Sequence, residues 1–146
     1  MNWEAISAIS EIVGAAAVVV SLIYVAAQIR QNTKMMRSAA KHSITETSQN
    51  FIYKAIDRSE EWVKLTTGED PSTPDEDSRM SLLVRAMLRG FESQCYQHES
   101  GLLEEDEWYA LRAAMRDLCS LPGMNKYWDQ LKPHMSERLR KVVDGR

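Results

Sequence analysis

The sequence predicts an all-α protein in which one N-terminal transmembrane helix is followed by a small cytoplasmic helical bundle. Three observations support this fold class. The first 29 residues contain no lysine or arginine, so all 18 basic side chains lie from Arg30 onward. Residues 12–27 form an apolar run typical of membrane helices. Farther along, apolar residues recur at spacings of three and four, and no alternating run indicates a strand.

The segment 5–29 is long enough to cross a bilayer. As a helix it would rise about 37 Å, against a hydrocarbon core of about 30 Å, and Glu11 is its only charged residue. A cleavable signal peptide fits poorly, because Glu4 and Glu11 stand where basic residues belong and no small-residue cleavage site follows. A buried helix in a soluble oligomer stays open as a second alternative.

Basic residues after the apolar run predict the orientation. They begin at residue 30, and no acid follows before Glu46. The positive-inside rule therefore places the N-terminus outside and the following domain in the cytoplasm. The same side chains would lie beside anionic lipid headgroups, each contributing about 1 kcal/mol near such a surface. This anionic-lipid flank consists of Arg30, Lys34, Arg37 and Lys41.

Small and polar residues of the first segment fall on one helical stripe, because the steps between them alternate three and four. Helices in bilayers associate through such small-residue faces, with hydroxyl and amide groups as hydrogen-bonding contacts. We therefore expect a partner helix, from a second copy or from another subunit. The membrane-helix packing face consists of Ser7, Ser10, Gly14, Ala17, Ser21, Tyr24 and Gln28.

The remaining chain, 31–146, is expected to form one domain. Residues 31–66 would supply a juxtamembrane segment and a first cytoplasmic helix over 41–66, and whether this helix continues the membrane helix of 1–30 stays open. A loop follows, in which Thr73 is a candidate N-cap with Glu76 three residues later, typical of a capping box. The rest of the bundle occupies 74–146.

Apolar spacing within 74–146 predicts the core of the bundle. A helix over 74–99 ends near Gly101, a second begins in the acidic run 104–107, and a short one lies before Pro133 with Ser136 as the cap of a last turn. The expected core positions of these helices are Met80, Val84, Met87, Leu88, Phe91, Cys95, Trp108, Leu111, Met115, Leu118, Tyr127, Trp128 and Leu131.

No motif indicates catalysis, a cofactor or a metal. The three histidines lack the Glu-x-x-His spacing of di-iron bundles, and Cys95 with His98 has no second pair to complete a zinc site. Cys95 and Cys119 are expected to be reduced core residues, and the net charge of −3 argues against a nucleic-acid partner. Arg85 and Arg89 are better interpreted as a solvated face paired with acids than as a phosphate site.

Several short motifs of the sequence are distinctive when they are taken together. They are Ser21–Tyr24, Gln28–Thr33, Arg85 with Arg89, Phe91-Glu92, Tyr96-Gln97, Gly101–Leu103, and Pro122-Gly123 before Trp128. This set resembles a family of uncharacterised bacterial proteins with one N-terminal transmembrane helix and a C-terminal helical domain. The resemblance implies a bacterial inner-membrane setting and the two-part architecture, and it transfers no catalytic residue or ligand.

These expectations favour a non-enzymatic single-pass membrane protein that acts as an accessory or scaffold subunit of a larger membrane assembly or homo-oligomer. Its expected partners are membrane lipids and another transmembrane helix. The alternative is a membrane-tethered sensor or regulatory module that binds a small molecule or a soluble partner. That alternative requires an apolar pocket in the bundle with converging polar groups.

Overall fold

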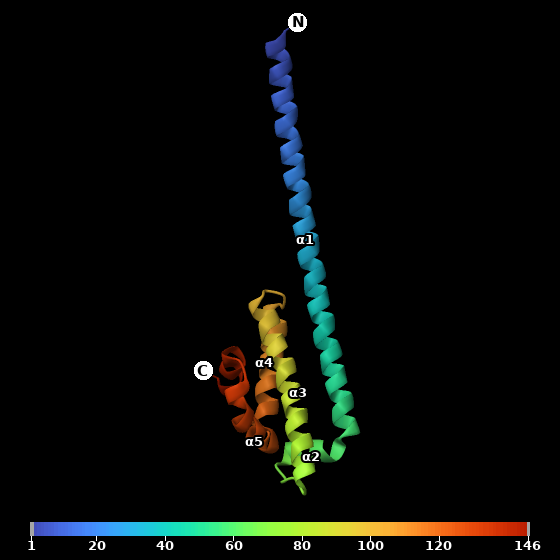
Figure 1. Cartoon of the computed structure of the whole chain (residues 1–146), viewed down its shortest axis with the longest axis vertical. Helices are drawn as coiled ribbons and strands as arrows, with labels where there is room; N and C mark the ends of the chain where they lie inside the picture. Colours follow the sequence, from blue (N-terminus) through green and yellow to red (C-terminus); the bar gives the residue numbers. More distant parts are fainter. Residues whose placement is uncertain (1, 146) are drawn as a thin grey trace. The chain divides into compact units, whose positions relative to one another are not determined.

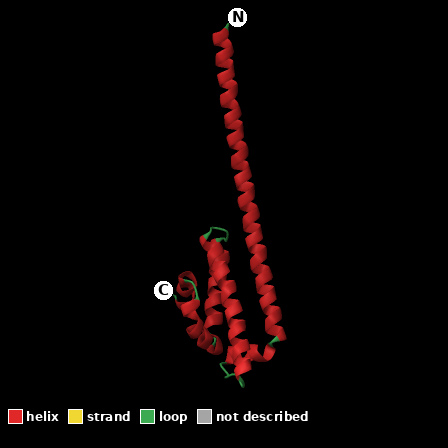
Figure 2. Cartoon of the chain, in the orientation of Figure 1, coloured by secondary structure: helices red, strands yellow, loops and turns green. Residues whose placement is uncertain are grey.

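The computed structural model describes residues 2–145, and the protein is all-helical with one long apolar N-terminal helix (Figures 1 and 2). Residues 2–145 contain no strand. The chain divides between Ala39 and Ala40 into two compact units, and each is described separately.

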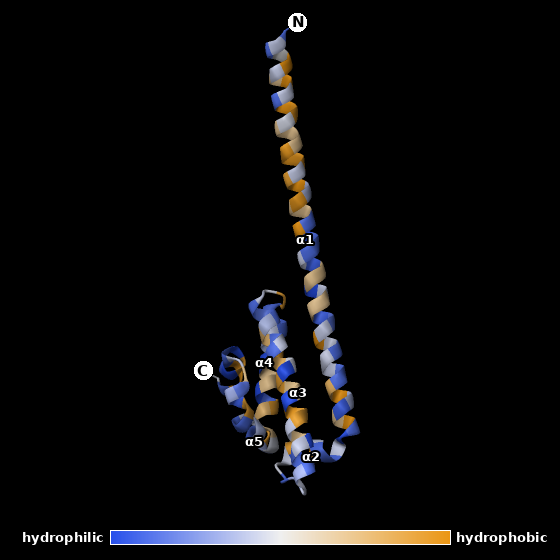
Figure 3. Ribbon diagram, in the orientation of Figure 1, coloured by the Kyte–Doolittle hydropathy of each residue, from blue (hydrophilic) through white to orange (hydrophobic). Residues whose placement is uncertain are grey.

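The first helix, α1 (Trp3–Asp57), begins in the apolar segment and extends into the second unit. No glycine or proline occurs between Gly14 and Gly68, so nothing in the sequence terminates the helix at residues 31–33. Helix α1 runs through these residues without a break. The first cytoplasmic helix therefore continues the apolar N-terminal helix, a point that the sequence left open. Figure 3 shows the change along α1 from apolar residues near its start to mixed residues after the basic flank.

The expected helix over 41–66 is interrupted, and that prediction was wrong at Arg58. This residue leaves the helical region with φ −119° and ψ 45°, and α2 (Ser59–Thr67) follows it. The break has a tertiary cause, because it turns α2 so that Leu65 is fully buried. It also brings the Trp62 ring edge-on to Phe51, with 5.4 Å between ring centroids.

Helix α3 (Pro74–Glu99) begins and ends near the expected residues. The Thr73 hydroxyl accepts a hydrogen bond from the Glu76 N–H at 3.1 Å, which confirms the N-cap. The Glu76 carboxylate does not close the capping box on Thr73; it accepts from the Ser72 N–H at 2.6 Å instead. Past the other end, Gly101 takes a positive φ of 69°, and the backbone turns away from the helix there.

The rest of the second unit consists of α4 (Glu105–Ser120), α5 (Pro122–Leu131), a short 3₁₀ helix η1 (Lys132–His134) and α6 (Glu137–Asp144). The Ser136 hydroxyl accepts from the Leu139 N–H at 3.4 Å, as expected for a cap of the last helix. Helix α5 packs on α2, α3 and α4, while α6 packs on α3 and α4.

The core of the bundle follows the apolar spacing predicted for 74–146. Most of the predicted residues are buried, and Phe91, Leu111 and Leu118 pack partly buried against them. Sequence reasoning missed Leu65, Met124, Met135 and Leu139, which complete the core. By contrast, Ile52, Ile56 and Val63 are 51–64% exposed, although they are apolar.

Candidate functional site

The apolar part of α1 is exposed on all sides. Its large apolar side chains from Ile6 to Ile29 are each 47–69% exposed. The helix is long and apolar enough to cross a membrane. The predicted packing face lies on this segment, and all of its members are exposed: Ser7, Ser10, Gly14, Ala17, Ser21, Tyr24 and Gln28.

Two hydroxyl groups of the packing face are already engaged within the helix. The Ser10 hydroxyl donates to the Ile6 carbonyl at 2.9 Å, and the Ser21 hydroxyl donates to the Ala17 carbonyl at 2.8 Å. Each oxygen can still accept a hydrogen bond, but its proton is committed. The packing face therefore consists mainly of small side chains that leave room for another helix. The space beside Gly14 is open, since a Cβ there would meet no atom within 4 Å.

The basic flank divides between the two units. Arg30, Lys34 and Arg37 are exposed and lie on one face of α1, because they are spaced four and three residues apart. The Lys41 ammonium instead donates to the Glu107 carboxylate at 2.5 Å, in the second unit. This hydrogen bond, reinforced by the charge of Glu107, raises the pKa of Lys41.

An apolar groove, with a cavity volume of about 520 Å³, lies between the second half of α1 and helices α2, α3 and α4. Gly90 allows α1 to approach α3 here, since a Cβ on Gly90 would lie 3.2 Å from the Thr47 methyl carbon. The polar side chains along its wall are Thr47, Ser48, Asn50, Lys54 and Gln94. The apolar residues along the wall include Phe51, Ile52, Trp62, Leu83, Met87, Phe91, Leu111 and Leu118.

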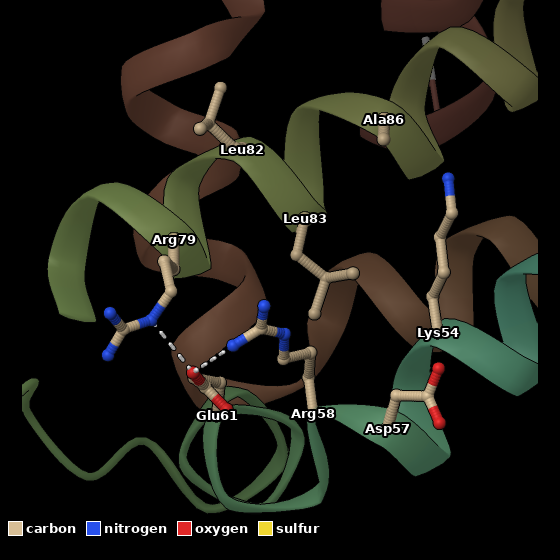
Figure 4. A pocket seen from close by; sticks show the side chains of 8 residues that line it. All are labelled: Lys54, Asp57, Arg58, Glu61, Arg79, Leu82, Leu83 and Ala86. Carbon is tan, nitrogen blue, oxygen red and sulfur yellow. Dashed lines mark hydrogen bonds and ion pairs between the residues drawn. The ribbon is translucent and has the colours of Figure 1, made fainter. Parts of the chain in front are cut away.

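A charged cleft of about 360 Å³ adjoins this groove and shares Lys54, Leu83 and Ala86 with it. In Figure 4, Arg58 and Arg79 both point toward Glu61, while Lys54 lies apart from that cluster. The Arg79 Nε lies 3.0 Å from the Glu61 carboxylate, and the nearest Arg58 nitrogen lies 3.9 Å from it. The Glu61 backbone N–H and Arg79 together lower the pKa of the Glu61 carboxyl group. The cleft is thus a structural ion-pair network at the junction of α1, α2 and α3.

The thiols of Cys95 and Cys119 are buried and unreactive. Burial raises the pKa of Cys95 to about 11 and the pKa of Cys119 to about 12, so both are protonated at neutral pH. His98 does not pair with Cys95; its ring stacks on Trp108 at 4.3 Å between centroids. Among the described residues, no group of three or more histidine, cysteine, aspartate or glutamate side chains could hold a metal.

The arginine and aromatic residues that could have formed a binding site have structural roles instead. Arg89 pairs with Glu92 at 2.5 Å, which confirms the solvated-face interpretation for this arginine. Among the aromatic residues, Trp108, Tyr127 and Trp128 are buried, whereas Tyr109 is 67% exposed. Tyr109 faces solvent, and the Arg112 guanidinium lies over its ring.

Comparisons with known proteins add no relative. No family model matches the chain, no curated protein matches it, and no solved structure matches it.

Proposed function

We propose that the protein is a single-pass protein of the bacterial inner membrane that holds a helical domain at the cytoplasmic surface. The observation that carries this proposal is the exposure of every large apolar side chain described from Ile6 to Ile29. Moving one such side chain from water into an apolar medium is favourable by about 1.5–3 kcal/mol. Lipid is the environment that suits an isolated helix with this surface, because all its backbone groups are paired internally.

The orientation of the proposed protein follows from the flank. Arg30, Lys34 and Arg37 follow the apolar segment directly and remain exposed. Basic residues stay on the cytoplasmic side during insertion, which places the N-terminus outside. The three side chains would then contact anionic headgroups.

We assign the protein a non-enzymatic role as an accessory or scaffold subunit. The membrane-helix packing face would dock on a transmembrane helix of a second copy or of a larger assembly, and the bundle would contact or stabilise that assembly. The small side chains of the face allow two helix backbones to approach closely.

A fractionation and topology experiment tests the proposal. Full-length protein should stay with membranes after an alkaline carbonate wash, and a C-terminal green fluorescent protein should fluoresce while a C-terminal alkaline phosphatase stays inactive. Replacing Arg30, Lys34 and Arg37 by glutamine should weaken this bias, whereas replacing Arg112, Arg116 and Arg140 in the bundle should leave it unchanged. A protein that is monodisperse and soluble without detergent would contradict the proposal.

One observation favours a second function, a membrane-tethered regulatory module that binds a small molecule. The groove between α1, α3 and α4 has the volume of a ligand pocket and a mainly apolar wall. This groove supports the alternative, which a binding measurement with apolar small molecules would test.

A further inference from the structure

The apolar groove carries one cation on its wall. Among the residues that the structure describes, Lys54 is the only charged side chain that lines the groove. Its ammonium group forms no ion pair or hydrogen bond within residues 2–145. Two other cations, Arg58 and Arg79, lie in the adjoining charged cleft, and both point toward Glu61 (Figure 4). Their charges are offset by that carboxylate, whereas the charge of Lys54 is not.

The orientation of Lys54 leaves room for an anion. In Figure 4 this side chain extends away from Asp57 and toward Ala86 of α3. Asp57 lines the charged cleft and not the groove, whereas Ala86 lines both. An anion bound in the groove would therefore be attracted by Lys54 without lying against the Asp57 carboxylate.

A buried amide also lines the groove. Gln94 is 5% exposed, and its Oε1 atom has no hydrogen-bond partner among the described residues. The last torsion of a glutamine side chain is broad, so a rotation about it turns either amide atom toward the groove. An unpaired amide in an apolar wall favours a ligand that brings a hydroxyl group, because a hydroxyl group both donates and accepts.

Lys54 and Gln94 lie toward opposite ends of the groove. Gly90 of α3 lies beside Thr47 of α1, and the second half of α1 and α3 run in opposite directions (Figure 1). Lys54 follows Thr47 by seven residues and Gln94 follows Gly90 by four, so their backbones are about 16 Å apart along the helices. The groove therefore has a cation toward one end, an amide toward the other and a mainly apolar wall between them.

We propose that the groove binds a long-chain carboxylic acid that carries a hydroxyl group near the end of its chain. The carboxylate would pair with Lys54, the chain would lie against Phe51 and Met87, and the hydroxyl group would pair with Gln94. The inference rests on the second proposed function, the regulatory module that binds a small molecule. It does not depend on whether α1 crosses a membrane.

Calorimetric titration of the full chain in phosphatidylcholine nanodiscs tests the head group, with protein-free nanodiscs as the blank. The probes are ω-hydroxydodecanoate, dodecanoate and dodecylamine, which share one chain length. Dodecylamine should bind at least about tenfold more weakly than dodecanoate, because its ammonium group would be repelled by Lys54. Equal or tighter binding of dodecylamine would overturn the proposal.

The comparison of the two acids tests the hydroxyl group. In a groove without a polar partner the hydroxy acid would bind more weakly than dodecanoate, because burying an unpaired hydroxyl group is unfavourable. Beside Gln94 it should bind about fivefold more tightly, and Gln94→Leu should remove this preference without weakening dodecanoate. Gln130→Leu, at an exposed glutamine on α5, is the matched control and should bind like the parent. Weaker binding of the hydroxy acid to the parent chain would overturn the assignment of Gln94.

Two further variants locate the site. Lys54→Gln should weaken both acids about tenfold, as expected for a partly exposed charge-assisted hydrogen bond, and should leave dodecylamine no weaker. Lys141→Gln, at an exposed lysine on α6 outside the groove wall, is its matched control and should bind like the parent. Ala86→Trp, at an exposed position on the groove, should block all three probes. Unchanged binding of the acids in Lys54→Gln, in a variant that unfolds cooperatively, would overturn the site.

Flotation of the same protein with phosphatidylcholine vesicles separates this inference from the membrane proposal. A chain that floats but binds none of the probes retains the membrane anchor and overturns the groove site. A chain that binds the hydroxy acid but does not float supports the groove site and contradicts the anchor. Binding of dodecylamine alone would retain the small-molecule groove of the second proposed function and overturn the carboxylic acid as its ligand.

Discussion

Gly123 lies where the start of α5 meets the end of α2. A Cβ at this position would lie 2.6 Å from the Leu65 carbonyl oxygen and 2.7 Å from the Lys64 carbonyl oxygen. Backbone atoms of α2 thus fill the space that any side chain would need. Gly68 closes the same contact from the other side, because its positive φ of 84° ends α2 against Pro122.

Gly123→Ala should lower the free energy of unfolding by about 1–3 kcal/mol, because the new methyl group would overpack a rigid backbone contact. Gly90→Ala is the matched control. Its Cβ would lie 3.2 Å from the movable Thr47 methyl group, so the gain in helix propensity of about 1 kcal/mol should offset the crowding. Thermal unfolding of both full-length variants in mild detergent, followed by circular dichroism, measures the difference. Equal melting temperatures would show that α2 moves freely away from α5.

At the scale of an element, α1 combines two kinds of surface in one helix. Its first part exposes apolar side chains on every side, whereas Ile44 and Phe51 of its second part pack on the core of the bundle. The packing face adds a third feature, a row of small and polar residues in which the hydroxyl protons of Ser10 and Ser21 are already bound to the helix itself. Association through this face therefore depends on close backbone approach.

Ser10→Leu combined with Gly14→Leu should weaken self-association or subunit association by about tenfold, a loss comparable to interhelical contacts of about 1–2 kcal/mol. Ile12→Leu combined with Val19→Leu changes the opposite face and should have no effect. Energy transfer between labelled copies in vesicles measures self-association, and pull-down in mild detergent measures binding to other subunits. Full retention of assembly in the packing-face variant would remove this face from the proposed function.

At the scale of the whole bundle, buried or half-buried carboxylates join elements that are distant in sequence. Glu76 on α3 pairs with Lys64 on α2 at 2.9 Å. Glu92 on α3 accepts from the Ser136 N–H before α6 at 2.5 Å. The hydrogen bonds from Lys64 and from the Ser72 N–H lower the pKa of Glu76. Although burial opposes it, the Ser136 N–H and Arg89 hold the pKa of Glu92 below its ordinary value.

These lowered pKa values predict acid-sensitive stability. Each carboxyl group has a lower pKa in the folded than in the unfolded state, so its contribution is complete above the unfolded pKa of about 4.3. The contribution is lost as the pH falls through the folded pKa. The melting temperature should therefore drop below about pH 5, and Glu92→Gln should reduce the drop while Glu105→Gln, an exposed acid on α4, should not. A melting temperature independent of pH between about 3 and 7 would contradict this account.

Local sequence signals determined much of this molecule. The apolar segment, the Thr73 cap, the boundaries of α3 and the core positions Met80, Val84 and Leu88 all followed from spacing and composition. Such features depend on residues three or four apart, which the sequence specifies directly. The membrane setting, the orientation and the role of the packing face remain predictions, because they concern lipid and partners outside the chain.

Only the tertiary structure decided where distant residues meet. The break at Arg58 carries no proline or glycine, and it exists because α2 must turn to bury Leu65. The groove likewise depends on how α1, α2, α3 and α4 pack, so no local motif predicted it. Spacing determines which face of a helix is apolar, but long-range packing determines which part of that face is covered and which part stays exposed.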